Sequence, residues 1–251
     1  MKKRSSPKPL TIDDRTIAVV SEFFASKKNG LVKAYTWQIP YDDLPKGVSI
    51  NRKMSLFDQN IGLKMILMHV LQHASKKERH GIIDFYINKW GGIHGNSEKT
   101  MAFYSSASPR ELMATGTKGI ASWSKALSIQ DPKTYAIFDA RVSACLNALI
   151  LKDIKRGRVF FPILQSRNTT IAPFNKTLRS RIAKAQERSF PPSVAYSAYL
   201  DLLTAVAKKN KVELSAVEMC LFTHAEELVK KVEKNQAFLS RFFDDGDRIV
   251  A

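Results

Sequence analysis

Apolar residues recur three or four positions apart along most of the chain, which is the spacing of helices that bury one face. Residues 31–39 are instead typical of a strand that ends at Pro40, and residues 151–190 form an irregular basic segment. Helices are predicted over 11–27, 56–73, 81–90, 97–105, 109–114 and 120–130, then from 139 onward and around 196–203 and 217–228. The pattern therefore predicts a mainly α fold with little or no sheet.

Helix signals and the spread of glycine and proline favour one compact unit. Thr11 with Asp14, and Ser215 with Glu218, have the spacing of capping boxes at the starts of the first and last helices. The chain has no internal repeat, and its glycines and prolines are scattered as single breaks. We expect a basic N-terminal tail over 1–10 and a single helical domain over 11–251.

The charge balance narrows the possible partners. Lys and Arg number 40 against 23 Asp and Glu, a formal charge of +17, and such a field favours a polyanion, with nucleic acid first. Cys145 and Cys220 cannot make a disulfide framework, a four-cysteine zinc site or an iron–sulfur cluster, which indicates a reducing compartment. No stretch after the basic start is apolar enough for a signal peptide or a membrane span. We expect a soluble cytoplasmic protein with no membrane partner.

A glycine-bearing turn over 116–119 starts the helix that follows it. Backbone N–H groups at such a helix start point outward, so a phosphate can dock there without any reading of sequence. The predicted DNA contacts of this hairpin, over 116–125, are Gly116, Thr117, Lys118, Gly119, Ser122 and Lys125. The next helix opens at Asp139, and a helix N-terminus favours the charged form of an acid.

This central segment resembles the helix–hairpin–helix DNA glycosylases, the superfamily of endonuclease III and 8-oxoguanine DNA glycosylase. Those enzymes carry a catalytic aspartate at a helix start, at a set distance after the second hairpin glycine. Twenty residues separate Gly119 from Asp139, and Asn147 follows where the family often has an asparagine. The resemblance implies a two-lobed helical domain with an 8-oxoguanine-glycosylase-like fold, and Asp139 as the catalytic residue.

Carboxylate chemistry fits that role for Asp139. Breaking an N-glycosidic bond builds positive charge on the sugar, and an ionised carboxylate nearby lowers that barrier. Asp139 would steady the cation, orient water, or both; the alternative is that it only caps a helix. The lysine that forms a Schiff base in lyase-competent relatives falls at Ala121 here. The resemblance therefore predicts a monofunctional enzyme that leaves an abasic site, with Lys118 and Lys125 facing solvent or phosphates.

A flipped nucleotide needs a pocket of aromatic and hydrogen-bonding groups. Two stretches outside the predicted helices mix such residues, and the candidates that they supply are Trp37, Gln38, Trp90, His94 and Asn96. The alternative for each tryptophan is ordinary core packing, and Trp123, on a helical stripe, is expected to be core.

Other polar residues have competing interpretations. In the basic segment, Arg156 and Arg158 are either DNA contacts or part of a solvated face. His69 and His73 have the spacing of a metal pair, but their apolar surroundings favour ordinary histidines. Glu218 is expected to serve a helix cap. No metal or redox cofactor is implied.

The leading expectation is a monofunctional glycosylase that acts on double-stranded DNA in a prokaryotic cytoplasm, on nucleoid or phage DNA, without an obligate protein partner. By analogy with antiphage relatives, the preferred substrate is α-glucosyl-hydroxymethylcytosine of viral DNA, and oxidised or alkylated bases in repair are the alternative. A non-catalytic DNA-binding protein stays open as a second hypothesis. An RNA-docking regulator is disfavoured because no RNA-binding motif is present.

Overall fold

The computed structural model describes residues 10–235, so nearly all of the predicted basic tail over 1–10 lies outside the described residues. The elements in chain order are α1 (Asp14–Ala34), the 3₁₀ turn η1 (Tyr41–Asp43), α2 (Leu56–His73), α3 (Lys76–Asp84), the π-helical turn η2 (Phe85–Trp90), α4 (Glu98–Ser106), α5 (Pro109–Ala114), α6 (Ile120–Gln130), α7 (Ala140–Asp153), β1 (Val159–Phe160), α8 (Ile171–Lys184), β2 (Arg188–Ser189), α9 (Ala195–Asn210) and α10 (Leu214–Lys234). The prediction of a mainly helical chain is confirmed.

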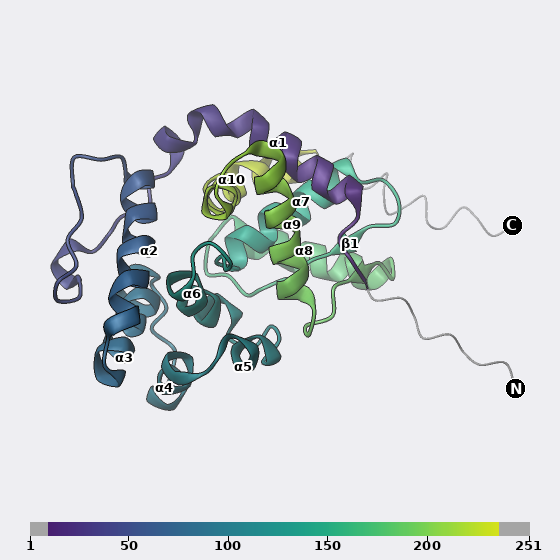
Figure 1. Cartoon of the computed structure of the whole chain (residues 1–251). Coiled ribbons are helices and arrows are strands. Elements are labelled where there is room, and N and C mark those ends of the chain that lie inside the picture. Colours follow the sequence, from purple (N-terminus) through teal and green to yellow (C-terminus); the bar gives the residue numbers. More distant parts are fainter. Residues whose placement is uncertain (1–9, 236–251) are drawn as a thin grey trace, which may run out of the picture.

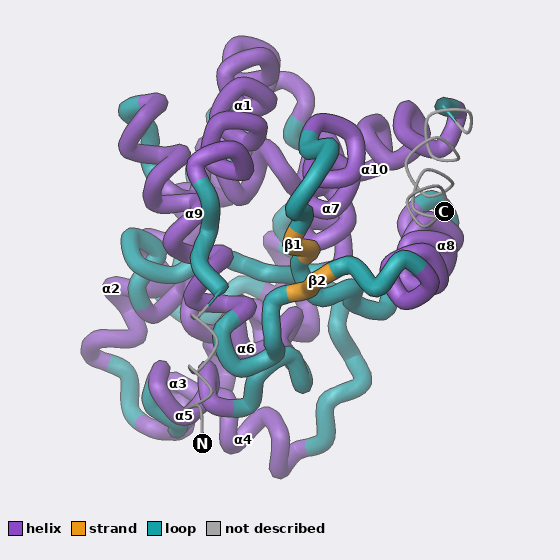
Figure 2. The backbone as a smooth tube through the Cα atoms, turned by 90° about the vertical axis from the view of Figure 1, so that its right-hand side faces the viewer, coloured by secondary structure: helices purple, strands orange, loops and turns teal. Residues whose placement is uncertain are grey.

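The helices fall into two groups with α6 between them. Figure 1 shows α2 to α5 on one side of the molecule and α1 with α7 to α10 on the other. α7 packs along α10, α1 contacts α9 and α10, and α2 contacts α6. Within residues 10–235 the sheet consists of β1 and β2 alone, paired in parallel with Val159 opposite Arg188 (Figure 2).

The core fixes the short extended stretch that leads into α7. Trp123 is fully buried, as expected for a core residue, and its ring packs edge-on against Tyr196. The hydroxyls of Tyr196 and Tyr199 donate to the backbone oxygens of Ala136 and Ile137 at 2.8 and 2.7 Å. These bonds hold the backbone just before α7 in place, because an unpaired buried hydroxyl or carbonyl would be costly.

Several local predictions are wrong. Residues 31–34 continue α1 instead of starting a strand, since Leu31 is buried and its carbonyl accepts the N–H of Tyr35. The α1 cap is Asp13, whose side chain accepts from the N–H of Thr16, so the predicted Thr11 and Asp14 capping box is not formed.

The predicted helix over 81–90 is also different in the structure. It is the end of α3 followed by the wider π-helical turn η2, a feature found often at functional sites. Of the helices in the described part of the chain, none combines the length and the hydropathy needed to cross a bilayer.

Candidate active-site pocket and DNA-contacting hairpin

A small pocket forms where α6, α7 and α10 meet the stretch after α1 and the end of η2. Its volume is 30 Å³, which is room for about one water molecule. The lining residues are Tyr35, Trp37, Trp90, Gly91, Lys125, Ile137, Asp139, Glu218 and Phe222. The structure thus brings together four of the site residues that the sequence singles out, Trp37, Trp90, Lys125 and Asp139, from distant parts of the chain.

Asp139 is the N-cap of α7. Its Oδ1 accepts the backbone N–H groups of Arg141 and Val142 at 2.9 and 3.0 Å, which explains why the helix begins there. Both bonds go to Oδ1, and no residue between 10 and 235 donates a hydrogen bond to Oδ2. One carboxylate oxygen of Asp139 therefore caps the helix, and the other accepts no hydrogen bond from a described residue.

Lys125 reaches the same pocket from α6. The residue is 4% exposed, and its Nζ donates to the backbone oxygen of Ala121 at 3.0 Å. Burial lowers the pKa of the Lys125 ammonium, while the negative charges of Asp139 and Glu218 act in the opposite direction. The expectation that Lys125 faces solvent or phosphates is wrong.

The side chain of Lys125 lies so close to residue 91 that a residue with a Cβ does not fit there. A Cβ on Gly91 would lie 2.6 Å from the backbone oxygen of Ile87 and 2.7 Å from Lys125 Cε. A larger residue would therefore push the lysine side chain out of its position, which makes glycine the residue that fits after η2.

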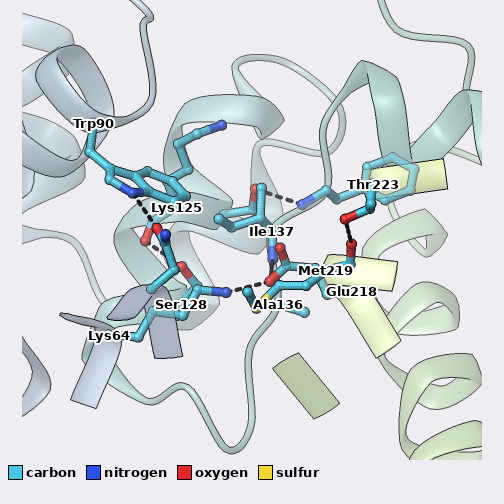
Figure 3. A network of polar contacts seen from close by, with 12 residues as sticks. Lys64, Trp90, Lys125, Ser128, Ala136, Ile137, Glu218, Met219 and Thr223 are labelled. Atoms are coloured by element: carbon cyan, nitrogen blue, oxygen red, sulfur yellow. Dashed lines mark hydrogen bonds and ion pairs between the residues drawn. The ribbon is translucent and has the colours of Figure 1, made fainter. Parts of the chain in front are cut away.

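Glu218 is the second carboxylate of the pocket, and sequence reasoning missed its role. Its Oε2 pairs with Lys64 Nζ at 2.5 Å, with both side chains buried, and accepts the N–H of Ile137 at 3.4 Å (Figure 3). The expected cap is wrong, because α10 starts at Leu214 with Glu213 as N-cap. Lys64 balances the charge of Glu218, so Asp139 is the carboxylate of the pocket that has no direct cationic partner.

Aromatic rings make one wall of the pocket. Trp90 stacks on Tyr86 at 4.2 Å and donates through Nε1 to Asn60 Oδ1 at 2.7 Å. Trp37 donates to the backbone oxygen of Trp90 at 3.1 Å and packs edge-on against Phe222 at 5.3 Å. The two tryptophans therefore pack in the core and also line the pocket.

The other candidate base-contacting residues lie elsewhere. Gln38 and His94 are exposed and do not line the pocket. Asn96 donates to Ser122 Oγ at 3.0 Å instead of reaching the pocket. Ser122 is itself 3% exposed, so the predicted phosphate contact by its side chain is wrong.

The hairpin leads into α6, and several of its backbone N–H groups donate to no described residue. Gly119 precedes α6 in the left-handed region with φ of +68°. Gly116 is buried against Pro192, and its N–H donates to the backbone oxygen of Met113, which takes it out of the predicted phosphate contacts.

The rest of the hairpin offers donors to a ligand. The N–H groups of Thr117, Lys118 and Gly119 form no hydrogen bond within the described residues, and Lys118 and Gly119 are exposed. These three amides could hold one phosphate.

The basic segment divides into exposed and buried cations. Arg156 is exposed. Arg158 is 4% exposed and pairs with Glu187 Oε1 at 2.5 Å beside the ring of Phe160, so the predicted phosphate contact by Arg158 is wrong. An arginine already buried with a carboxylate has lost the exposure that a phosphate contact needs.

Metal ligation finds no support in the described part of the chain. No group of three or more His, Cys, Asp or Glu side chains there is placed to hold a metal ion. His69 and His73 contact each other edge-on with ring centroids 5.4 Å apart.

Comparisons with known proteins return no match: no protein-family model, no curated protein and no solved structure is similar to this chain.

Proposed function

We propose that this chain is a DNA glycosylase that takes a modified nucleotide out of double-stranded DNA and hydrolyses its N-glycosidic bond. The observation that carries the proposal is the meeting of Asp139 with Trp37 and Trp90 around one pocket. α6 supplies Lys125 to that pocket and begins at a hairpin with unpaired backbone N–H groups, which supports a DNA contact next to the site. The net charge of +17 adds an attraction for the duplex.

The proposed reaction uses the unbonded oxygen of Asp139. Water adds to C1′ of the sugar as the bond from C1′ to the base nitrogen breaks. The base leaves with the bonding electrons and takes up a proton, while the attacking water loses one to Asp139 or to solvent. A carboxylate fixed in a small pocket with little room for water stabilises the cationic sugar of the transition state more than it would in bulk water.

Entry of a base requires movement of side chains. A space of 30 Å³ holds no nucleobase, so the rings of Trp37 and Phe222, which are only half-buried, would have to shift as the nucleotide enters. The vacated position between aromatic rings would then hold the base by stacking. The rings would thus also close the site when no nucleotide is bound.

The preferred substrate in this proposal is α-glucosyl-hydroxymethylcytosine, and an oxidised or alkylated base is the alternative. The test incubates the protein with duplexes that differ only in one base: glucosylated hydroxymethylcytosine, hydroxymethylcytosine, cytosine or 8-oxoguanine. Mass spectrometry of the released base and alkali cleavage of the abasic strand give the readout. Binding without release from any duplex would favour a non-catalytic DNA-binding protein and overturn the proposal.

A second candidate activity follows from the position of Lys125. Sequence spacing leaves Ala121 where the lyase lysine would be, yet the Lys125 amine lies in the pocket with Asp139. A desolvated amine can attack the C1′ aldehyde of an abasic sugar, lose water and form an iminium ion. The iminium ion makes the C2′ proton acidic, and loss of that proton to a base with departure of the 3′-phosphate would break the strand. The enzyme would then be a glycosylase with lyase activity.

Borohydride trapping separates the two candidates. A duplex that already contains an abasic site is mixed with the protein and sodium borohydride, which reduces an iminium ion to a stable covalent link. A monofunctional enzyme gives no covalent product. A product that persists in Lys118→Gln, on the exposed hairpin, and disappears in Lys125→Gln would assign the lyase activity to Lys125.

A further inference from the structure

A buried asparagine of α2 bonds both tryptophans of the pocket wall. Asn60 is 1% exposed and does not line the pocket itself. Its Nδ2 donates to the backbone oxygen of Trp37 at 3.0 Å, and its Oδ1 accepts from Trp90 Nε1 at 2.7 Å. One side chain therefore joins two parts of the wall that lie 53 positions apart in the chain.

The hydrogen-bonding capacity of the Asn60 amine group is fully used. Besides Trp37, Nδ2 donates to the backbone oxygen of Leu56 at 2.8 Å, one turn earlier in α2. An aspartate in this place would offer acceptors alone, and a serine a single donor. A fully satisfied buried amide fixes one arrangement of its partners, whereas apolar contacts tolerate several.

The amide holds the two tryptophans in different ways. The Trp90 ring is itself fixed, because it bonds Asn60 and also stacks on Tyr86 at 4.2 Å. For Trp37 the backbone is fixed: within residues 10–235, Asn60 is the only donor to its carbonyl, and no backbone–backbone hydrogen bond involves this residue. The Trp37 ring is half-buried and donates to the backbone oxygen of Trp90 at 3.1 Å. Breaking that bond would let the ring turn while its backbone stays in place.

The same side of α2 also holds the carboxylate side of the pocket. Lys64 follows Asn60 by one helical turn and pairs with Glu218 at 2.5 Å (Figure 3). Both α2 residues are buried, and both bond residues that line the pocket. Ordinary packing of α2 needs neither polar group.

We infer that Asn60 is a positioning residue of the base pocket, which fixes the Trp90 ring and the Trp37 backbone so that a base enters between a fixed ring and a ring that turns. The inference rests on the proposed function, because its ligand is the extruded base. Loss of the Asn60 amide would then disturb stacking of the base and leave the contacts of the duplex backbone unchanged.

The test compares the removal of two neighbouring buried amides. Asn60→Leu removes the bonds to both tryptophans. Gln59→Leu is the matched control, because Gln59 is 4% exposed and bonds the Tyr41 hydroxyl and the backbone oxygen of Met54, neither of which lines the pocket. Melting temperatures confirm that both variants fold. If Asn60→Leu does not fold, Asn60→Ser takes its place, since one hydroxyl can donate to Trp37 or accept from Trp90 but cannot replace all the bonds of the amide.

Three quantities are measured on the duplexes described above, which differ only in one base. The first is the single-turnover rate of base release, and the second is the dissociation constant from fluorescence anisotropy. The third is quenching of tryptophan fluorescence by a duplex with a modified base, beyond that by the cytosine duplex, which needs no catalysis. The chain has three tryptophans, and Trp123 is fully buried outside the pocket, so this added quenching reports on Trp37 and Trp90.

The expected result is an effect confined to the pocket. Asn60→Leu should abolish the added quenching and slow base release at least about tenfold, because misplacement of an orienting group by about 1 Å can cost about 10²-fold in rate. Its dissociation constant should stay within about twofold of that of the parent, since phosphate contacts dominate affinity for DNA. Gln59→Leu should match the parent in all three quantities, even if its melting temperature falls as far.

Other outcomes overturn the inference. Equal effects of Asn60→Leu and Gln59→Leu on quenching and rate would make Asn60 an ordinary core residue, and so would an Asn60→Leu variant that behaves like the parent. If the parent releases no base but shows added quenching that Asn60→Leu removes, the proposed function fails and the positioning role is supported. If the parent releases a base without added quenching, only the positioning role fails.

Discussion

Replacement of Asp139 by asparagine separates its two roles, because the variant keeps a capping oxygen and loses the charge. Asparagine and aspartate are about equally good N-caps, so the bonds from Arg141 and Val142 can persist. Loss of the charge at the start of α7 should cost only about 0.3–1 kcal/mol of stability. For a chain of this size that corresponds to a fall of at most a few degrees in melting temperature.

The expected effect on catalysis is much larger than the effect on stability. Removal of one preorganised group that stabilises transition-state charge typically lowers kcat by about 10²–10³, or ~3–4 kcal/mol. We therefore expect Asp139→Asn to release the modified base at least about a hundredfold more slowly while it binds the same duplex with similar affinity.

The assay is single-turnover base release with enzyme in excess, so that product dissociation does not limit the rate. Asp131→Asn is the matched control, because Asp131 also accepts two backbone N–H groups, from Lys133 and Thr134, but lies outside the pocket. Release by Asp139→Asn at the rate of the parent protein would refute the reasoning and reduce Asp139 to a helix cap.

Three further predictions concern the surroundings of Asp139. Glu218→Gln leaves the Lys64 ammonium buried without its carboxylate, so urea unfolding should show a loss of about 3–5 kcal/mol, and a loss below about 1 kcal/mol would contradict the buried pair. Gly119→Ala places a Cβ against the hydroxyl of Tyr104, at a residue whose φ is left-handed. This change should lower both the melting temperature and the affinity for an unmodified duplex. Unchanged affinity would show that the hairpin is not part of a DNA interface. Burial lowers the pKa of Lys125, so the unfolded chain holds this proton to a higher pH than the folded chain does. The free energy of unfolding of the parent, compared with that of Lys125→Met, should therefore rise as the pH approaches 10.5, the usual pKa of lysine. A difference in stability that does not depend on pH would argue against the lowered pKa.

Sequence reasoning succeeds where local signals decide the structure. The inner face of α7 repeats at helical spacing because Val142, Cys145, Leu146 and Leu149 all enter the core. Asp139 could be placed at a helix start because an N-cap needs only its own side chain and the next few N–H groups.

The failures have tertiary causes. The strand predicted over 31–39 fails at 31–34 because Leu31, Lys33 and Ala34 are good helix formers and burial of Leu31 keeps this turn in α1. Every residue of α6 from Ser122 to Ile129 is buried, so no polar face remains to show which way Lys125 points. Lys64 and Glu218 are 154 positions apart, and their pairing depends on the packing of α2 against the rest of the fold. Lys64 is the single charged residue in the otherwise apolar run from Ile61 to Met68, and that was the one signal that could have indicated it.

The charges around the pocket are hard to explain by stability alone. Lys64, Lys125 and Glu218 are almost fully buried, and Lys125 and Glu218 line the pocket with Asp139. Burial of charged groups costs several kcal/mol each before pairing offsets part of it. Well-packed apolar residues in the same positions would serve a purely structural core as well or better. Lys64 and Glu218 form a balanced pair that also holds the N–H of Ile137, two residues before Asp139. That arrangement fixes the start of α7 and leaves Asp139 as the carboxylate without a direct cationic partner. In the proposed reaction this is the group that would gain an interaction as the sugar becomes cationic, and this is the physical reason to propose a chemical role for the site.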